Sequence, residues 1–238
     1  MNRVDFLKTL RSPVPNLVLK KYPDGDIMQY WGENPALYSM YFGQHDDFSI
    51  HVSGHTGVDI AGPHRTLIYA AHDGTVNFAG GRTSDTGGLQ VYLDSPLLDQ
   101  ETPQNSMIRT AYAHFDELAV KTGDVVSRGA LLGYMGNTGF VVSGNSAYWG
   151  NAPAGTGTHL HFGLHESIAD GLGGWKPRYP NPMGNTVDPL PYISDPTPND
   201  DVADGNLSGL MIVLQNLAQY LKDKYRTLVG IAPLPTRV

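Results

Sequence analysis

The sequence predicts a mainly β protein in which antiparallel sheets form a groove, followed by one amphipathic α-helix near the C-terminus. Three observations support this prediction. The 238 residues include 28 glycines and 17 prolines, which favour tight turns. Short runs of β-type residues recur along most of the chain. A sustained helical period appears only after residue 203.

Seven short runs are rich in β-branched and aromatic residues and are bounded by Gly, Asp, Asn or Pro. We expect each run to form a strand with antiparallel neighbours. The runs are TGVDIA (56–61), TLIYAA (66–71), GTVNFAG (74–80), LQVYLD (89–94), IRTAYAHF (108–115), ALLGYMG (130–136) and THLHFGLH (158–165).

The distribution of strand-like, proline-rich and helical stretches divides the chain into five segments. We expect an N-terminal arm (1–21), one compact domain (22–193), an acidic, proline-containing linker (194–206), an amphipathic helix (207–229) and a tail (230–238). The helix carries apolar residues at steps of three and four: Leu210, Met211, Leu214, Leu217, Leu221, Tyr225 and Leu228. Its apolar stripe would pack on its own domain, or would mediate self-association or docking to other subunits, and both alternatives stay open.

Composition excludes several classes of protein. The net charge of −7 argues against nucleic acid or an anionic membrane as the main partner. No apolar run is long enough to span a membrane, and the first twenty residues lack the apolar core of a secretory signal. Because the chain has no cysteine, a metal would have to be bound by His, Asp or Glu.

Histidines gather in a pattern typical of a metal site. In the run 158–165, His159, His161 and His165 share one face of the strand because side chains alternate with a period of two. His55 and Asp59 are four residues apart, so in an extended strand they would also share a face. Two histidines and one aspartate suit zinc, and three protein ligands leave a coordination position open, as in catalytic sites.

These motifs carry a resemblance to a known family. His55-x-x-x-Asp59, the stretch YAHF around His114 and the stretch HLHF around His159 and His161 resemble the signatures of the lysostaphin-type peptidoglycan endopeptidases. YAAHDGTVNFAG, VKTGDVVSRGALLGYMGNTG and VDPLPYI are similar to the family and follow in the expected order. The resemblance covers roughly residues 26 to 193. It implies the lysostaphin-type peptidase fold, with zinc held by His55, Asp59 and His161 and with His114 and His159 as catalytic histidines.

The chain departs from the family in two places. A tyrosine often found upstream of the first metal histidine is replaced by the stretch 49–52 (SIHV). Between GNTG and HLHF stands a longer insertion, 140–157, which contains Tyr148 and Trp149. We expect these two aromatic side chains to bind substrate as a wall of the groove, although packing within the loop is the alternative. A second long loop, 167–186, would form the opposite wall.

The sequence therefore predicts an enzyme. It would be a zinc metalloendopeptidase that hydrolyses peptide bonds of bacterial peptidoglycan, in a cross-bridge or a stem peptide. It would act outside the cytoplasm at the cell wall, and since no signal peptide is seen, it could be part of a phage virion or an endolysin. The alternative is a structural or wall-binding protein, for example of a phage particle, that uses the same fold without cleaving.

Overall fold

The computed structural model describes residues 3–36, 52–98 and 105–193. The predicted linker, amphipathic helix and tail lie outside these residues. Within them most of the regular secondary structure is strand, together with a short helix, α1 (Arg3–Leu7), and a 3-10 turn, η1 (Leu190–Tyr192). None of the helical segments described is of the length and hydropathy that crossing a bilayer requires.

The strands follow one another closely along the chain. Their bounds are β1 (Ile27–Gln29), β2 (Val58–Ala61), β3 (Leu67–Tyr69), β4 (Gly74–Gly80), β5 (Leu89–Leu98), β6 (Asn105–Leu118), β7 (Val125–Val126), β8 (Leu131–Met135), β9 (Phe140–Ser143), β10 (Ser146–Trp149), β11 (His159–Ala169), β12 (Trp175–Pro177) and β13 (Thr186–Val187). Each of the seven predicted runs contains or overlaps a strand, so the mainly β, antiparallel prediction is confirmed.

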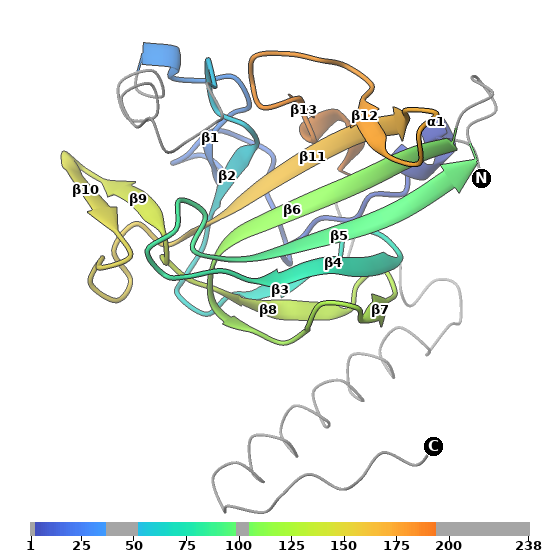
Figure 1. Ribbon diagram of the computed structural model, residues 1–238. Helices are drawn as coiled ribbons and strands as arrows, with labels where there is room; N and C mark the ends of the chain where they lie inside the picture. Colours follow the sequence, from blue (N-terminus) through green and yellow to red (C-terminus); the bar gives the residue numbers. More distant parts are fainter. Residues whose placement is uncertain (1–2, 37–51, 99–104, 194–238) are drawn as a thin grey trace, which may run out of the picture.

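Most strands of the described chain join one sheet with the order β1-β2-β11-β6-β5-β4-β7. The strands β12 and β13 pair with β11, whereas β8 pairs with β3 and β6. The centre of the sheet is formed by β11, β6 and β5, which lie side by side as long antiparallel strands (Figure 1). The strands β9 and β10 form a separate hairpin, which projects at the end of the sheet opposite α1 (Figure 1).

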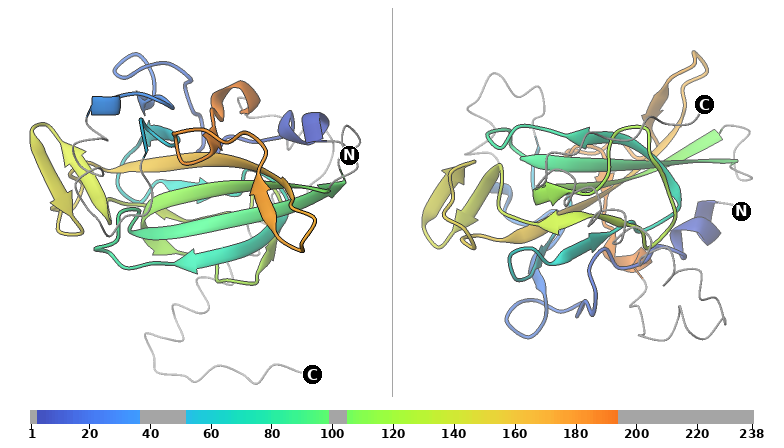
Figure 2. Two further views of the ribbon diagram at one scale, coloured as in Figure 1. Left: turned by 45° about the horizontal axis from the view of Figure 1, so that its top comes forward. Right: turned by 90° about the horizontal axis from the view of Figure 1, so that it is seen from below.

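One face of the sheet is covered by the N-terminal segment and η1, which lie on the same side in both views of Figure 2. The apolar side chains of β2 and β11 point to this face, and Ile60, Leu160 and Phe162 are fully buried there. Five residues of the segment predicted as an arm join the same core: Phe6, Leu7, Leu10, Val14 and Leu17. Because the apolar residues of β11 fill this core, its histidines are turned to the opposite face.

Candidate metal centre and its groove

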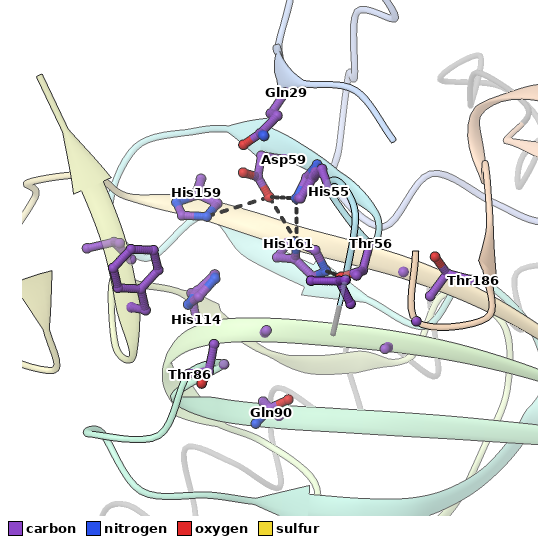
Figure 3. A pocket seen from close by; sticks show the side chains of 18 of the residues that line it. Gln29, His55, Thr56, Asp59, Thr86, Gln90, His114, His159, His161 and Thr186 are labelled. Carbon is purple, nitrogen blue, oxygen red and sulfur yellow. Dashed lines mark hydrogen bonds and ion pairs between the residues drawn. The ribbon is translucent and has the colours of Figure 1, made fainter. Parts of the chain in front are cut away.

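Strand β11 places its histidines next to residues of β2 and β6. The backbone register pairs His161 with Asp59 of β2 on one side and with Ala113 of β6 on the other. The alternation predicted for this strand is present, since Leu160, Phe162 and Leu164 are fully buried in the core while His159, His161 and His165 line a cavity. Figure 3 shows His55, Asp59 and His161 pointing toward one another.

His55 reaches this cluster in a different way from the one predicted. Strand β2 begins at Val58, so His55 lies in the bend before it rather than on the same extended strand as Asp59. Gly57 makes the bend possible, because a Cβ there would lie only 2.5 Å from the carbonyl oxygen of Phe162. The two side chains still meet, with His55 Nε2 3.0 Å from Asp59 Oδ1.

Three potential ligand atoms form a compact triangle. His55 Nε2 lies 2.9 Å from His161 Nδ1, and Asp59 Oδ1 lies 3.0 Å from each of these nitrogens. Among the described residues, this is the group of His and Asp side chains with the spacing to hold a metal ion. His55 is buried, and Asp59 and His161 are only 14% and 19% exposed. The centre is therefore largely shielded from solvent.

Hydrogen bonds on the outer side of the rings determine which nitrogens face the centre. His55 Nδ1 lies 3.1 Å from the carbonyl oxygen of Tyr30, so it carries the proton and leaves a lone pair on Nε2. His161 Nε2 lies 3.4 Å from Thr56 Oγ1, a hydroxyl that can accept the Nε2 proton and so leave the lone pair on Nδ1. Two imidazole lone pairs and a carboxylate oxygen then face one another at about hydrogen-bonding distance. A cation among them removes this repulsion, so the residues fit a zinc ion.

The protonation states of the cluster also suit a bound cation. Burial acts to raise the pKa of Asp59, but the neighbouring His55, His159 and His161 outweigh it and hold that pKa well below its usual range. Burial lowers the pKa of His161, with Asp59 opposing the effect. Asp59 is thus a carboxylate and His161 favours its neutral form, which are the protonation states that metal binding requires.

Two further histidines stand beside the triangle. His114 Nδ1 and His159 Nδ1 each lie 2.7 Å from a backbone carbonyl oxygen, that of Thr138 and of Gly157 respectively. Both rings therefore keep Nε2 for the cavity, and their centroids are 4.6 Å apart. His159 Nε2 is 3.7 Å from Asp59 Oδ1. Burial lowers the pKa of His114 well below its usual value, and His159 and His161 add to this effect.

His114 adopts an unusual backbone conformation, with φ of +67°. Its amide donates a hydrogen bond to the carbonyl of Gly87, and the register of β6 is irregular directly after it. Left-handed backbone at a residue with a Cβ costs on the order of 1 kcal/mol, and such residues cluster at functional sites. The irregularity turns the His114 ring toward His159.

The cluster lines a cavity of about 630 Å³. Its lining comes from β1, β2, β5, β6, β9, β11 and β13 and from the segments around Thr56, Thr86 and Gly184. His55, Asp59, His114, His159 and His161 all contribute to it. Chemically, such a site combines residues able to hold a metal with two imidazoles that can exchange protons, all lining one cavity.

The comparison of the chain with protein-family models matches "Peptidase family M23" over residues 53–171, which is half of the chain. The chain belongs to peptidase family M23. The matched range contains every residue of the candidate metal centre and both flanking histidines. The sequence resemblance to the lysostaphin-type endopeptidases is thereby confirmed.

The chain is similar to a peptidoglycan endopeptidase in sequence and to M23 and lysostaphin catalytic domains of known structure. The peptidoglycan DD-endopeptidase ShyA of Vibrio cholerae is 32% identical over 113 residues, which is 48% of this chain and 20% of that protein. The chain thus matches only a fifth of the length of this relative. The catalytic domain of the prophage-encoded M23 protein EnpA of Enterococcus faecalis is 21% identical, with a TM-score of 0.41 over 75% of this chain and 95% of that domain. The catalytic domain of lysostaphin from Staphylococcus simulans is 22% identical, with a TM-score of 0.40 over 70% and 90% of the two chains.

Within this M23 domain, the aromatic residues predicted to bind substrate lie on the β9–β10 hairpin. Tyr148 and Trp149 are on β10, and neither lines the cavity. Trp149 instead packs against Phe140 of β9, with ring centroids 4.5 Å apart, and Phe140 lines the cavity. A role for Tyr148 and Trp149 in substrate binding stays a prediction. Trp149 could affect the shape of the groove only by positioning Phe140.

Several lining residues of the M23 domain were not found by sequence reasoning. Gln29, Thr56, Gln90 and Arg109 come from four different segments, whereas Phe140 belongs to the insertion 140–157 that was expected to form a wall. The sequence did hold a signal for Arg109. It lies in the strand run IRTAYAHF, five residues before His114, and a charged side chain inside such a run needs an oppositely charged or hydrogen-bonding partner. Its partner, Asp94, could be found only from the pairing of β5 with β6.

Proposed function

We propose that this M23 domain is a zinc-dependent endopeptidase that hydrolyses peptide bonds of bacterial peptidoglycan. The observation that carries the proposal is the triangle of His55 Nε2, Asp59 Oδ1 and His161 Nδ1, with edges of 2.9 to 3.0 Å and with its imidazole protons held on the outer side. The family membership and the stretch shared with a peptidoglycan DD-endopeptidase support peptidoglycan as the substrate. The site of action would be the bacterial cell wall.

In this proposal His55, Asp59 and His161 hold the zinc ion. When bound, zinc supplies a Lewis acid that polarises a substrate carbonyl and makes a water molecule more acidic. Thr56 and the Tyr30 carbonyl orient two of the ligands by accepting hydrogen bonds from their outer ring nitrogens. Their contribution is to keep both lone pairs aimed at one point.

His114 and His159 are assigned to proton transfer. The Nε2 atoms of both rings are left for the cavity by the hydrogen bonds at Nδ1. Because its pKa is held well below the usual value, His114 is neutral near pH 7 and ready to accept a proton. Together the pair would accept a proton from the attacking water and return one to the departing amine. We assign these two roles to the pair jointly.

The domain boundaries proposed from the sequence, with the endopeptidase domain at 22–193, stay predictions, as do docking through the helix 207–229 and carriage by a phage. The burial of residues between Phe6 and Leu17 shows that the arm contributes to the core of the domain. A protein that begins at residue 22 would therefore lack part of this core.

The test combines metal content with cleavage. Wild-type protein, His161→Ala and the control His64→Ala are purified, and zinc is measured together with release of new amino groups from several purified peptidoglycans. His64 lies outside the cavity lining and contacts Asp116, so its loss should change neither result. We expect about one zinc per wild-type chain, none in His161→Ala, and amino-group release only where zinc is bound. Circular dichroism verifies that both variants are folded.

Zinc binding without cleavage of any wall would contradict the enzymatic part of the proposal and favour a wall-binding role. Absence of zinc from folded wild-type protein supplied with the metal would contradict the assignment of the centre. The new amino termini would identify the bond that is cleaved.

A further inference from the structure

The groove changes character along its length. Beyond His161, the next residue of β11 on the same face is Gly163, followed by His165. The partners of these three residues on β6 are Ala113, Ala111 and Arg109. All six residues line the cavity. The floor therefore runs from the metal centre over glycine and two alanines to a polar end formed by Arg109 and His165.

The distance along this floor is set by the strands. Four residues separate His161 from His165, and four separate Ala113 from Arg109. At about 3.4 Å per residue, the polar end lies roughly 13 Å from the metal centre. An extended peptide has nearly the same rise, and the small side chains between the two ends leave room for its backbone. A peptide cleaved at the centre would present its fourth residue, in one chain direction, to Arg109.

Arg109 is held in a fixed orientation. Its Nε and Nη2 donate hydrogen bonds of 2.6 and 2.8 Å to the two carboxylate oxygens of Asp94. The guanidinium also lies over the Tyr92 ring, 5.5 Å from its centroid, and the Tyr92 hydroxyl donates to Gln90 Oε1 at 2.9 Å. Side chains that are held in this way lose little conformational entropy when they bind a ligand.

The cavity side of the Arg109–Asp94 pair is the positive side. Asp94 is 6% exposed and does not line the cavity, whereas the Arg109 side chain is 34% exposed and does. Within the described residues, the bonds to Asp94 use two of the five N–H donors of the guanidinium. The pKa of His165, lowered mainly by burial, is lowered further by Arg109, and Asp94 opposes this only as a smaller effect. The member of the ion pair that faces the groove at this end is therefore the cation.

We propose that Arg109, oriented by Asp94 and Tyr92, binds a carboxylate of the peptide substrate about four residues from the bond that is cleaved. This inference rests on the proposed function and adds substrate specificity to it. A carboxylate is the matching group because a guanidinium offers planar, paired N–H donors to two oxygens. The carboxylate would be either a side-chain group or the C-terminal group of a stem peptide, since both present the same chemistry.

The test uses soluble cross-linked stem peptides prepared from peptidoglycan in three forms: all carboxylates free, only the C-terminal carboxylates amidated, and only the side-chain carboxylates amidated. The proteins are wild type, the double variant Arg109→Gln/Asp94→Asn and the control Arg128→Gln. The double variant replaces the ion pair with an amide pair, so no buried charge is left without a partner. Arg128 is exposed, lies outside the cavity and gives the same loss of one positive charge.

For wild type and Arg128→Gln we expect kcat/KM to fall about 10- to 100-fold when the recognised carboxylate is amidated, as for the loss of a charged hydrogen bond. The form whose amidation causes the fall identifies the carboxylate. In the double variant the free and amidated peptides should be cleaved with nearly equal kcat/KM. Equal cleavage of all forms by wild type, or an unchanged preference in the double variant, would overturn the inference.

A measurement of peptide binding without cleavage tests this inference independently of the proposed function. The same peptides are titrated by calorimetry into wild type and the double variant prepared without metal, so that no turnover occurs. A preference for the free carboxylate in wild type that is lost in the double variant supports the inference even if no wall is cleaved. Cleavage that ignores amidation, together with binding that ignores it, contradicts the inference and leaves the endopeptidase assignment intact. Failure of every peptide to bind also overturns it.

Discussion

Thr56 offers a sensitive test of how the proposed metal ligands are oriented. Its hydroxyl lies 3.4 Å from His161 Nε2, and the opposite ring nitrogen of His161 belongs to the ligand triangle. The substitution Thr56→Val keeps the shape of the side chain and removes the hydroxyl that accepts the His161 proton. Loss of such a partner typically weakens metal binding 10- to 100-fold. Because 3.4 Å is long for a hydrogen bond, we expect the lower value, about 10-fold.

The effect on stability follows from mass action. At free zinc about 1,000 times the wild-type Kd, binding stabilises the folded state by about 4 kcal/mol, and a Kd raised about tenfold reduces this to about 2.7 kcal/mol. For a chain of 238 residues, 1 kcal/mol moves Tm by about 2–4 °C. Zinc should therefore raise the Tm of wild type by about 8–16 °C and that of Thr56→Val by about 3–6 °C less.

The assay is thermal unfolding with and without zinc, together with a competition measurement of zinc affinity. Thr9→Val is the matched control, because Thr9 Oγ1 donates to the carbonyl of Phe6 in the N-terminal segment, outside the cavity lining. Its zinc-dependent shift should equal that of wild type. An equal shift and equal affinity in Thr56→Val would refute the role of Thr56. No zinc-dependent shift in wild type would refute the metal centre itself.

Two further predictions concern the groove. Burial, with Arg109 second, lowers the pKa of His165 to about 4, whereas in the unfolded chain it is about 6.5. The unfolded chain therefore binds the proton first as the pH falls, and the stabilisation present above pH 6.5 is lost toward pH 4. Between pH 7 and 5, urea unfolding should show wild type losing up to about 2 kcal/mol more than His165→Gln, and equal losses would contradict the assignment. At Gly163, an added Cβ would be 3.5 Å from Ala111 Cβ, an ordinary contact, so Gly163→Ala should fold and cleave peptides. Gly163→Leu should keep its zinc but lose at least about tenfold in kcat/KM by filling the floor, and full activity would show that substrate lies elsewhere.

Much of the centre could be predicted from the sequence because it depends on local periodicity. In the run 158–165, alternation alone separated the histidines from Leu160, Phe162 and Leu164, and the structure places these two sets on opposite faces. The spacing of His55 and Asp59 pointed to a shared site, but the reason was different, because a bend at Gly57 rather than one continuous strand brings His55 to Asp59. The resemblance to the family supplied His114, whose turned backbone no periodic pattern predicts.

Other parts of the site depended on contacts between distant segments. The insertion 140–157 was predicted to present aromatic residues to the groove, yet β9 and β10 form a hairpin in which Trp149 packs on Phe140. Which of its residues line the cavity is set by the pairing of Trp149 with Phe140 in this hairpin. Similarly, the N-terminal residues looked like an arm because they are short of regular periodicity, whereas Leu7 and Leu10 are buried in the common core.

By itself, the sequence determined the strand-rich architecture, the inward and outward faces of β11 and the residue types able to hold a metal, because each follows from neighbours within a few positions. Only the tertiary structure decided that Thr56 and the Tyr30 carbonyl lie against the outer ring nitrogens of His161 and His55, and that Asp94 fixes Arg109 in a groove floored by Gly163 and Ala111. These relations depend on the register between strands far apart in the chain. That register is set by packing across the whole sheet, which no local pattern contains.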